Sequence, residues 1–420
     1  MEIPIDRGGL RCYNGQNQIL QLKDRGAARK SRNGGRRCKA VAILKGLAAE
    51  GNMLRMLPGQ TENIRLTVAF AESYVLIVDF LPERFTSTGR NTVDHTADAE
   101  FRMGCFFIRK LQYMVLKHKK EIFTMRTASI FRGVATALIT PLTENGIDFD
   151  AYGRLIDWQI DQGINALVIA GTTGEGSTLT DAEHRASIRF AVERAAGRVP
   201  IIAGTGSNDT SYAISLTQYA CSVGADAMLV VTPYYNKATQ NGLIRMYTAI
   251  ADASTKPLIL YNVPSRTGVS IEPATYQALA EHPRIAAIKE ANGNISKIVE
   301  TAALVGDKLD IYSGNDDQIV PILSVGGSGV ISVLSNVMPA KTVEMCSRFF
   351  EGDVAGSAKM QLALLPLIHA LFSEVNPIPV KAAMAAMGFC ENYLRLPLTT
   401  LETAHEQVLL RLMREQNLIS

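Results

Sequence analysis

Short apolar runs alternate with amphipathic stretches along the chain from about Phe131 onward. Each apolar run ends in Gly, Thr, Asn or Pro, and the stretch after it has apolar residues three and four positions apart. We interpret the runs as eight strands, at 134–141, 166–171, 200–206, 227–233, 258–263, 285–291, 310–316 and 329–336. The segments between them, such as 181–196 and 210–224, follow Thr, Asp or Asn caps and predict amphipathic helices.

The predicted strands are almost entirely apolar, so both of their faces must be covered, as in parallel sheets with helical crossovers. Eight successive strand–helix units in about 210 residues predict a closed (β/α)8 TIM barrel. A doubly wound sheet is the alternative, but it requires a glycine-rich dinucleotide motif after the first strand, and that strand ends in Thr140 and Pro141. We therefore expect an α/β protein whose barrel occupies residues 125–338.

Residues 339–420 have a helical pattern and predict a C-terminal helical region after the barrel. We expect its prolines to separate the helices, at Pro366, Pro377, Pro379 and Pro397. Extra helices of this kind often build contacts between subunits.

Residues 1–124 differ chemically from the rest of the chain. They contain 21 Lys and Arg against 12 Asp and Glu, giving +9, while residues 125–420 contain 22 against 28, giving −6. Clustered Lys and Arg, as in the stretch 25–39, attract phosphates and are one way in which such a region binds nucleic acid. However, neither interleaved aromatic residues nor a known nucleic-acid-binding module accompanies this stretch. A solvated basic tail and a transit peptide are the alternatives, and Glu2, Asp6 and Asp24 weigh against the latter. We expect a basic extension of unknown fold, without nucleic acid as a partner.

Composition excludes several other classes of protein. The 47% of hydrophobic residues suffices for a core, and no apolar run reaches the ~18 residues that span a bilayer, because Glu72 and Asp79 interrupt the nearest candidate at 66–81. We expect no membrane segment, no secretory signal and a cytoplasmic location. The 6 cysteines and 6 histidines are dispersed without the spacing of a disulfide framework or a metal site, so we expect no metal.

Lys289 stands at the end of the sixth predicted strand, after the sequence Ile-Ala-Ala-Ile. Barrel enzymes carry their active sites at the carboxyl ends of the strands. Alternation places Lys289 on the same face as Ile285 and Ala287. A lysine in apolar surroundings has a lowered pKa, and its neutral amine attacks carbonyl groups to form an imine. Many lysines at strand ends are simply solvated or paired, so this residue alone does not decide the function.

Other strand ends carry groups that suit carboxylates and proton transfer. The second strand ends in GTTGEGSTL (171–179), where a tight turn leads into a helix N-terminus that favours an anion. The fifth ends in YNVPSRTG (261–268), with Tyr261 in the barrel mouth and Arg266 further out on the loop. The fourth ends in TPYYNK (232–237), with two more tyrosines. Plain turns and packed tyrosines explain each feature taken singly.

Taken together, these motifs resemble the dihydrodipicolinate synthase family of the wider N-acetylneuraminate lyase group of pyruvate aldolases. The resemblance covers roughly residues 126–420, and residues 1–124 have no counterpart in it. The matching motifs occur in the same order: GTTGE (171–175), AGTG (203–206), TPYYN (232–236), YNVPSRTG (261–268), IKEA (288–291), SGND (313–316), GVISV (329–333) and NPIPVK (376–381).

The resemblance implies a class I aldolase that condenses pyruvate with aspartate semialdehyde, without an organic cofactor or a metal. Lys289 matches the family's Schiff-base lysine. The matches to its proton relay are Thr172, Tyr261 and Tyr235, with Tyr235 reaching in from a neighbouring subunit. The matches to its substrate-binding residues are Thr173 for the pyruvate carboxylate, Arg266 for the semialdehyde carboxylate, and Gly314 and Ile331 for the pocket lining. A cytoplasmic homotetramer, a dimer of dimers, is also implied.

Two other functions stay open at this point. Another aldolase of the group, cleaving sialic acid or a 2-keto-3-deoxy sugar acid, is the nearer one, but Arg266 favours an aldehyde that carries a carboxylate. A ligand-sensing relative without catalysis is the other. A ligand-sensing relative would not need the complete set of Lys289, Thr172, Tyr235 and Tyr261, so their joint presence argues against it.

The resemblance also points to a regulatory site. In sensitive relatives lysine binds at a subunit interface, and the residues that match this effector site are His184, Asn208 and Tyr234. Three positions depart from the family pattern: Gly176 replaces a serine, Asp181 replaces a bulkier ring-bearing residue, and Tyr212 stands where an acidic side chain binds the effector's ammonium group. We therefore expect weak or absent inhibition by lysine.

Overall fold

The computed structural model describes residues 129–420 without a break, and before them only six short strands. These strands are β1 (Ile3–Pro4), β2 (Arg11–Asn14), β3 (Ile19–Lys23), β4 (Met53–Met56), β5 (Ile64–Phe70) and β6 (Tyr74–Phe80). They pair in one sheet, in the order β1-β3-β2-β6-β5-β4. The chain divides into two units, Met1–Glu121 and Ile122–Ser420. The expectation of a basic extension at residues 1–124 stays a prediction, because most of them lie outside the described residues.

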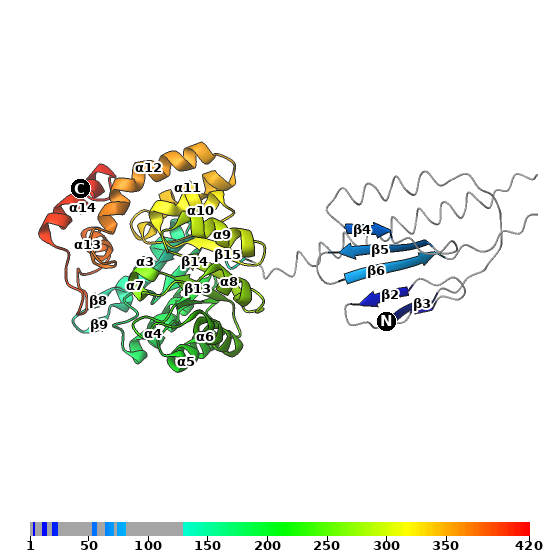
Figure 1. The fold of residues 1–420 in the computed structure, drawn as a ribbon. Coiled ribbons are helices and arrows are strands. Elements are labelled where there is room, and N and C mark those ends of the chain that lie inside the picture. Colours follow the sequence, from blue (N-terminus) through cyan, green and yellow to red (C-terminus); the bar gives the residue numbers. More distant parts are fainter. Residues whose placement is uncertain are drawn as a thin grey trace, which may run out of the picture. The chain divides into compact units, whose positions relative to one another are not determined.

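Eight parallel strands of the second unit close into a barrel (Figure 1). They are β7 (Gly133–Ala137), β10 (Ala166–Ile169), β11 (Ile201–Gly204), β12 (Ala227–Val231), β13 (Leu258–Asn262), β14 (Ile285–Glu290), β15 (Asp310–Ser313) and β16 (Gly329–Ser332). Each overlaps one of the eight predicted segments, and the order around the barrel follows the order along the chain. The predicted (β/α)8 barrel is confirmed.

The strands separate two apolar layers. One side of each strand fills the barrel interior, where side chains such as Val168, Ile259 and Ile331 pack together. The other side packs under the helices, with residues such as Leu167 and Leu260. This arrangement explains why the strands are apolar at nearly every position: both faces are covered.

Helices follow the strands and surround the barrel (Figure 1). They are α3 (Phe149–Asp161), α4 (Asp181–Ala195), α5 (Thr210–Ser222), α6 (Gln240–Ala253), α7 (Pro264–Thr267), α8 (Pro273–Leu279), α9 (Ile295–Val305), α10 (Ile319–Ser324) and α11 (Pro339–Phe350). A small hairpin, β8 (Leu142–Thr143) and β9 (Gly146–Ile147), precedes α3. The predicted caps are present: Thr180 forms a capping box with Glu183, and Asp209 caps α5.

Three more helices complete the C-terminal region: α12 (Val354–Leu371), α13 (Ile378–Ala386) and α14 (Thr403–Glu415). The prediction that Pro366 separates two helices is wrong, because Pro366 lies inside α12. A proline costs one backbone hydrogen bond there. The buried residues on both sides of it, such as Leu364 and Leu367, show that the helix continues because packing holds it.

Helix α12 is long and apolar enough to cross a membrane by length and composition alone, with a mean hydropathy of 1.3. We had expected no such segment. In the described residues, however, α12 packs against α11 and α14, and it buries the polar Gln361, whose Nε2 donates to the Asp316 carbonyl at 2.8 Å. These contacts show that α12 is partly buried against the neighbouring helices.

Candidate active site

Lys289 and Tyr261 lie side by side on β14 and β13. The two strands pair in parallel with Tyr261 opposite Lys289, and the Lys289 Nζ lies 4.3 Å from the centroid of the Tyr261 ring. Both side chains are buried, with 5% and 7% of their surface exposed. The amine is thus held against an aromatic face at the carboxyl end of the barrel, where barrel enzymes carry their sites.

Burial lowers the pKa of Lys289 to about 7. The nearby Asp316 carboxylate opposes this shift, and the Arg266 guanidinium adds to it. A substantial fraction of Lys289 is therefore an uncharged amine at neutral pH, and only this form has the lone pair that attacks a carbonyl group.

Asp316 is a buried carboxylate that interacts electrostatically with the Lys289 amine. It is not among the site residues predicted from the sequence. Its Oδ2 accepts hydrogen bonds from the backbone N–H groups of Val333 at 2.9 Å and Leu334 at 2.8 Å. Burial raises the pKa of Asp316, whereas its hydrogen bonds and Lys289 lower it. Its place in the SGND motif was the available signal.

The prediction that Ile285 shares a strand face with Lys289 is wrong. The pairing with β13 is irregular at this point, because Leu258 is opposite Ile285 while Ile259 is opposite Ala287. Ile285 packs in the layer under the helices, and Ala287 packs in the barrel interior. One extra residue in the strand changes the alternation, which sequence alone does not reveal.

Thr172 and Thr173 lie in the turn between β10 and α4. Thr172 is exposed and hydrogen-bonds the Tyr261 phenol, which lowers the pKa of Tyr261 against the larger upward effect of burial. Thr173 is buried, with 3% of its surface exposed. The structure therefore brings Thr172, Tyr261 and Lys289 together, as the sequence predicted.

Asn376, at the end of the segment before α13, joins two of the predicted substrate-binding residues. Its Nδ2 donates to the Thr173 Oγ1 at 2.9 Å, and its carbonyl oxygen accepts from the Arg266 Nη2 at 3.3 Å. Arg266 itself is an exposed residue of α7. The C-terminal region therefore contributes to the site, and the NPIPVK motif was the signal that we did not convert into a role.

A buried ion pair holds the Thr172–Thr173 turn against the C-terminal helices. The Lys381 Nζ of α13 lies 2.8 Å from the Glu175 Oε1, and both side chains are fully buried. The same Nζ donates to the Thr140 carbonyl at 2.6 Å. The backbone N–H of Arg395 donates to the Glu175 Oε2 at 3.2 Å. These contacts tie the loops after β7 and β10 to α13.

Gly314 and Ile331, the two predicted lining residues, lie after β15 and on β16. Ile331 on β16 is fully buried in the interior layer with Tyr261. Gly314 follows β15, and its N–H donates to the Glu290 carbonyl at 2.7 Å. A Cβ at Gly314 would lie 2.7 Å from the Cβ of Ala291, so only glycine fits this approach.

Tyr235 is not brought to Lys289 within one chain. Its side chain is 93% exposed, and its φ of 70° places it on a bend that projects from the surface. Tyr234 is partly exposed at 36%. The third member of the predicted relay therefore points away from the chain's own barrel.

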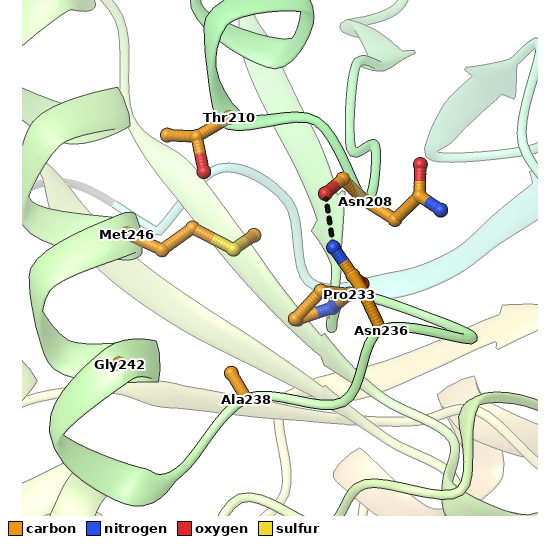
Figure 2. Close-up of a pocket in the computed structure, with 7 residues that line it drawn as sticks. All are labelled: Asn208, Thr210, Pro233, Asn236, Ala238, Gly242 and Met246. Carbon is orange, nitrogen blue, oxygen red and sulfur yellow. Dashed lines mark hydrogen bonds between the residues drawn. The ribbon is translucent and has the colours of Figure 1, made fainter.

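The predicted effector residues lie near this bend. The Asn208 Nδ2 donates to the Tyr234 carbonyl at 3.3 Å, while His184 is buried and its Nε2 is paired with the Gly204 carbonyl at 2.8 Å. Beside them is a pocket of about 140 Å³ (Figure 2). Its lining residues are Asn208, Thr210, Pro233, Asn236, Ala238, Gly242 and Met246.

The three departures from the family pattern each change this region. Asp181 pairs with the Arg185 Nε at 2.8 Å and also hydrogen-bonds Tyr212. A Cβ on Gly176 would lie 2.1 Å from the Ala170 carbonyl oxygen, so this backbone position excludes a serine.

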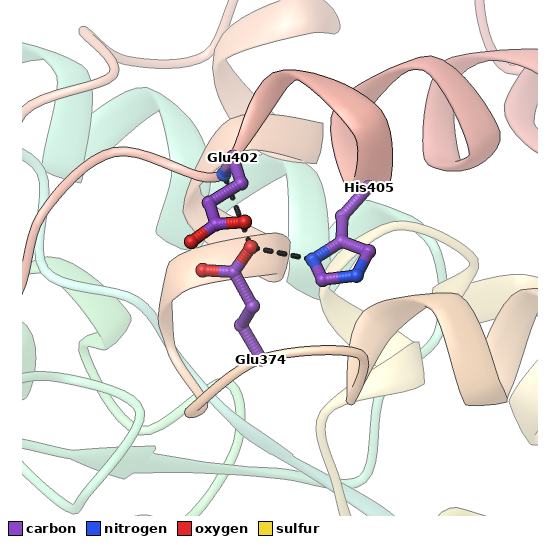
Figure 3. A group of neighbouring side chains, drawn as sticks. All are labelled: Glu374, Glu402 and His405. Atoms are coloured by element: carbon purple, nitrogen blue, oxygen red, sulfur yellow. Dashed lines mark hydrogen bonds and ion pairs between the residues drawn. The ribbon is translucent and has the colours of Figure 1, made fainter.

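One group of possible metal ligands occurs in the described residues. Ligand atoms of Glu374, Glu402 and His405 lie within 4.8 Å of one another (Figure 3). The Glu374 Oε1, however, already pairs with the His405 Nδ1 at 2.7 Å and accepts the Glu402 backbone N–H at 3.0 Å. These hydrogen bonds account for the arrangement of the group at the start of α14.

Comparison with known proteins gives consistent results. The sequence profile of the dihydrodipicolinate synthetase family matches residues 130–416. A 4-hydroxy-tetrahydrodipicolinate synthase of Lachnoclostridium phytofermentans is 53% identical over 293 residues, which is 69% of this chain and 100% of that protein.

Two solved structures are similar to this chain over about seven-tenths of its length. A monomeric dihydrodipicolinate synthase variant is 42% identical, with a TM-score of 0.68, covering 71% of this chain and 99% of the other. The enzyme of Cyanidioschyzon merolae, solved with lysine bound, is 37% identical, with a TM-score of 0.67, covering 69% of this chain and 100% of the other.

Proposed function

Because the chain belongs to the dihydrodipicolinate synthetase family, we propose that Lys289 is the lysine that forms its Schiff base with pyruvate. The enzyme condenses pyruvate with aspartate semialdehyde to 4-hydroxy-tetrahydrodipicolinate, a step of lysine and diaminopimelate biosynthesis. The observation that carries the assignment to Lys289 is its buried amine, 4.3 Å from the Tyr261 ring centroid, with a pKa of about 7.

The first half of the reaction forms a nucleophile from pyruvate. The neutral Lys289 amine adds to the ketone carbon, and loss of water gives the protonated imine. The imine withdraws electrons from the neighbouring methyl group, so a proton leaves that carbon and an enamine forms. Thr173, held by Asn376, binds the pyruvate carboxylate in this proposal.

The second half joins the two substrates. The enamine carbon attacks the aldehyde carbon of aspartate semialdehyde, and the new alkoxide takes a proton from the relay of Thr172, Tyr261 and Tyr235. The semialdehyde's amino group then displaces the Lys289 amine from the imine carbon, which closes the ring and regenerates the free lysine. Arg266 binds the semialdehyde carboxylate from the rim.

A second copy of the chain completes this relay in our proposal. Tyr235 is 93% exposed and cannot serve the barrel that carries it, but such a projecting side chain suits a site across an interface. We propose a homotetramer built as a dimer of dimers, in which Tyr235 of one subunit enters the site of its neighbour.

A cytoplasmic location, without membrane or nucleic-acid partners, belongs to the same proposal and is supported by the biosynthetic role of the family. A coupled assay with pyruvate and aspartate semialdehyde tests the activity. No product formation, with intact pyruvate binding, would favour the ligand-sensing alternative.

Replacing Arg266 by alanine leaves the pyruvate imine on Lys289 intact and lowers kcat/KM for aspartate semialdehyde by about one to two decades. The reason is the loss of a charge-assisted hydrogen bond worth ~1.5–3 kcal/mol. Steady-state kinetics measure it, with Arg284→Ala, an exposed arginine at the other end of β14, as the control. Unchanged semialdehyde kinetics, together with cleavage of sugar acids, would instead assign the chain to the other aldolases of the group.

Lysine inhibits this enzyme weakly or not at all. Tyr212 supplies no carboxylate for the effector's ammonium group, which costs ~1.5–3 kcal/mol or about one to two decades of affinity. Asp181 does not replace it, because Arg185 and Tyr212 already engage its carboxylate. Activity across a lysine titration is the measurement, with Tyr212→Glu as the variant that gains sensitivity. Half-inhibition of the unmodified enzyme at submillimolar lysine would contradict the prediction.

A chain that begins at Met125 folds and is as active as the full chain. The barrel and its C-terminal helices, with all the proposed site residues, lie within residues 129–420. Specific activity and size-exclusion chromatography of both chains measure it. An insoluble or inactive shorter chain would show that the basic extension belongs to the fold.

A further inference from the structure

Two pairs of residues stand opposite each other at the carboxyl ends of β13 and β14. Tyr261 is opposite Lys289, and Asn262 is opposite Glu290. Successive side chains of a strand point to opposite faces. The first pair therefore faces the barrel interior, and the second pair faces the surrounding helices.

The outer pair is joined by direct hydrogen bonds. The Asn262 Nδ2 donates to both carboxylate oxygens of Glu290, at 3.0 and 3.2 Å. The Asn262 Oδ1 in turn accepts the backbone N–H of Ile271 at 3.0 Å. Glu290 thus holds the end of β13 and, through Asn262, the segment that leads into α8.

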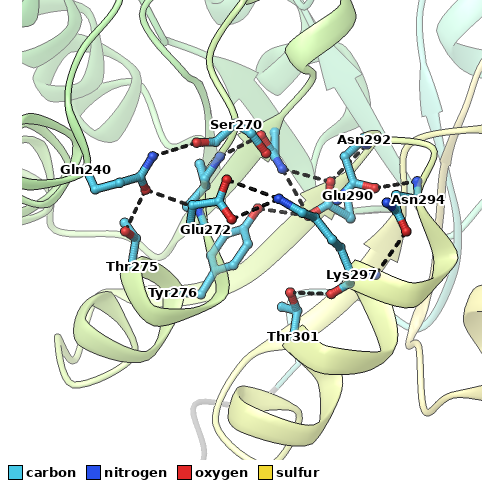
Figure 4. Close-up of polar contacts among 12 residues, drawn as sticks. Gln240, Ser270, Glu272, Thr275, Tyr276, Glu290, Asn292, Asn294, Lys297 and Thr301 are labelled. Atoms are coloured by element: carbon cyan, nitrogen blue, oxygen red, sulfur yellow. Dashed lines mark hydrogen bonds and ion pairs between the residues drawn. The ribbon is translucent and has the colours of Figure 1, made fainter.

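Glu290 also gathers contacts from two other elements (Figure 4). The Tyr276 hydroxyl of α8 donates to its Oε2 at 3.0 Å, and the Asn292 N–H donates to its Oε1 at 2.9 Å. Its side chain is buried, with 1% of its surface exposed. Every one of these partners is a donor, which matches an ionised carboxylate. Burial raises the pKa of Glu290 to about 7, and the hydrogen bonds from Asn262 and Tyr276 oppose that rise.

The charged groups nearest to this carboxylate are already paired with each other. Lys297 of α9 donates to both oxygens of Glu272, at 3.1 and 2.9 Å. Tyr276 of α8 stays protonated, since burial and Glu290 hold its pKa well above its usual value. In the part of the chain that the structure describes, no cation forms a direct ion pair with Glu290, and hydrogen-bond donors such as Asn262, Tyr276 and the Asn292 N–H hold it.

The hydrogen bonds between Asn262 and Glu290 join two strands whose pairing is irregular. The pairing of β13 with β14 shifts by one residue between Ile285 and Ala287. A slip of one residue moves every side chain to the other face of a strand. Contacts after the irregular position must therefore fix which residues of β14 face the barrel interior. The side-chain hydrogen bonds between Asn262 and Glu290 are such contacts, because these residues directly follow the Tyr261–Lys289 pair.

We propose that Glu290 is a positioning residue of the condensation: it clamps β14 to β13 and α8 on the outer face and so holds the Lys289 amine buried against the Tyr261 ring. The proposal rests on the assignment of Lys289 as the Schiff-base lysine. Glu290 itself does not touch substrate.

Reductive trapping of labelled pyruvate with cyanoborohydride, followed across a pH series, tests the proposal in the full-length enzyme. In Glu290→Gln the pH of half-maximal trapping on Lys289 moves upward by about one unit, and trapping at neutral pH slows about fivefold. The reason is that a less firmly buried lysine has a pKa closer to its ordinary value. Glu272→Gln, an acid of the same region that pairs with Lys297 at the surface, leaves the midpoint in place.

The direction of the shift separates positioning from other roles. If Glu290 acted only through its negative charge, its removal would move the midpoint downward, and a downward shift overturns the proposal. An unchanged midpoint with a lower melting temperature shows a packing role only and also overturns it.

The exchanged pair Asn262→Asp with Glu290→Gln supplies a second variant. It restores an amide–carboxylate hydrogen bond in the reverse direction, and we expect it to return the midpoint to within a few tenths of a unit of the original. If Glu290→Gln fails to fold, the exchanged pair still tests the proposal. In that case, a pH of half-maximal trapping that lies one unit higher than in the original enzyme, although the hydrogen bond is restored, contradicts the positioning role of Glu290. Absence of any Lys289 adduct in the unmodified enzyme is a separate result, which refutes the proposed Schiff-base lysine itself.

Discussion

Replacing Lys289 by alanine abolishes the trapping of pyruvate and lowers turnover by roughly a thousandfold or more. Lys289 supplies the electron pair for imine formation, and without it the pyruvate methyl group is not acidified. The buried lysine Lys381 cannot replace it, because its Nζ is engaged by Glu175 and Thr140. The loss is therefore one of chemistry rather than of binding.

Mass spectrometry after borohydride reduction with labelled pyruvate is the measurement for Lys289→Ala. Lys297→Ala, which removes the lysine of α9 that pairs with Glu272, is the control and keeps the adduct. A pyruvyl adduct on any other lysine of the unmodified enzyme, or trapping that persists in Lys289→Ala, would refute the mechanism.

Replacing Lys381 by methionine lowers the free energy of unfolding by roughly 3–5 kcal/mol, since it leaves the Glu175 carboxylate buried without its cation. Both members of this pair are fully buried. Catalysis suffers as well, because Glu175 lies directly after the turn that carries Thr172 and Thr173.

Urea unfolding at neutral pH measures the effect of Lys381→Met. Arg348→Met, which removes a cation that pairs with Glu344 and Asp353 at the surface, is the control, and exposed pairs contribute only ~0–1 kcal/mol. The double variant Glu175→Gln with Lys381→Met should recover much of the lost stability. A Lys381→Met enzyme as stable as the control would show that the pair contributes nothing to the fold.

The sequence predicted the barrel because each strand is covered on both faces and therefore apolar throughout, and because helices such as α4 and α5 begin at recognisable caps, Thr180 and Asp209. It also predicted the neighbourhood of Lys289, Tyr261 and Thr172, since the carboxyl ends of adjacent barrel strands meet at one edge. These features depend on local patterns and on one topological rule.

Other features depend on contacts between distant parts of the chain. Asn376 lies more than a hundred residues from both Thr173 and Arg266, so no local pattern connects them. The sequence pattern does not predict that Glu290 is buried, because a carboxylate in an apolar run usually indicates the end of a strand. Its burial is explained only by its hydrogen-bond donors, which come from other parts of the chain. The sequence pattern predicts a helix boundary at Pro366, whereas α12 continues through it because of tertiary packing, which no local pattern reveals.

The shift of register between Ile285 and Ala287 divides β14 into two halves that pack in different layers. The first half is seated by Ile285 under the helices, and the second by Ala287 and Lys289 in the interior. Ala286 between them is the extra residue of the strand. Without Ala286, regular alternation from Ile285 would place Ala287 and Lys289 on the same faces as they occupy now.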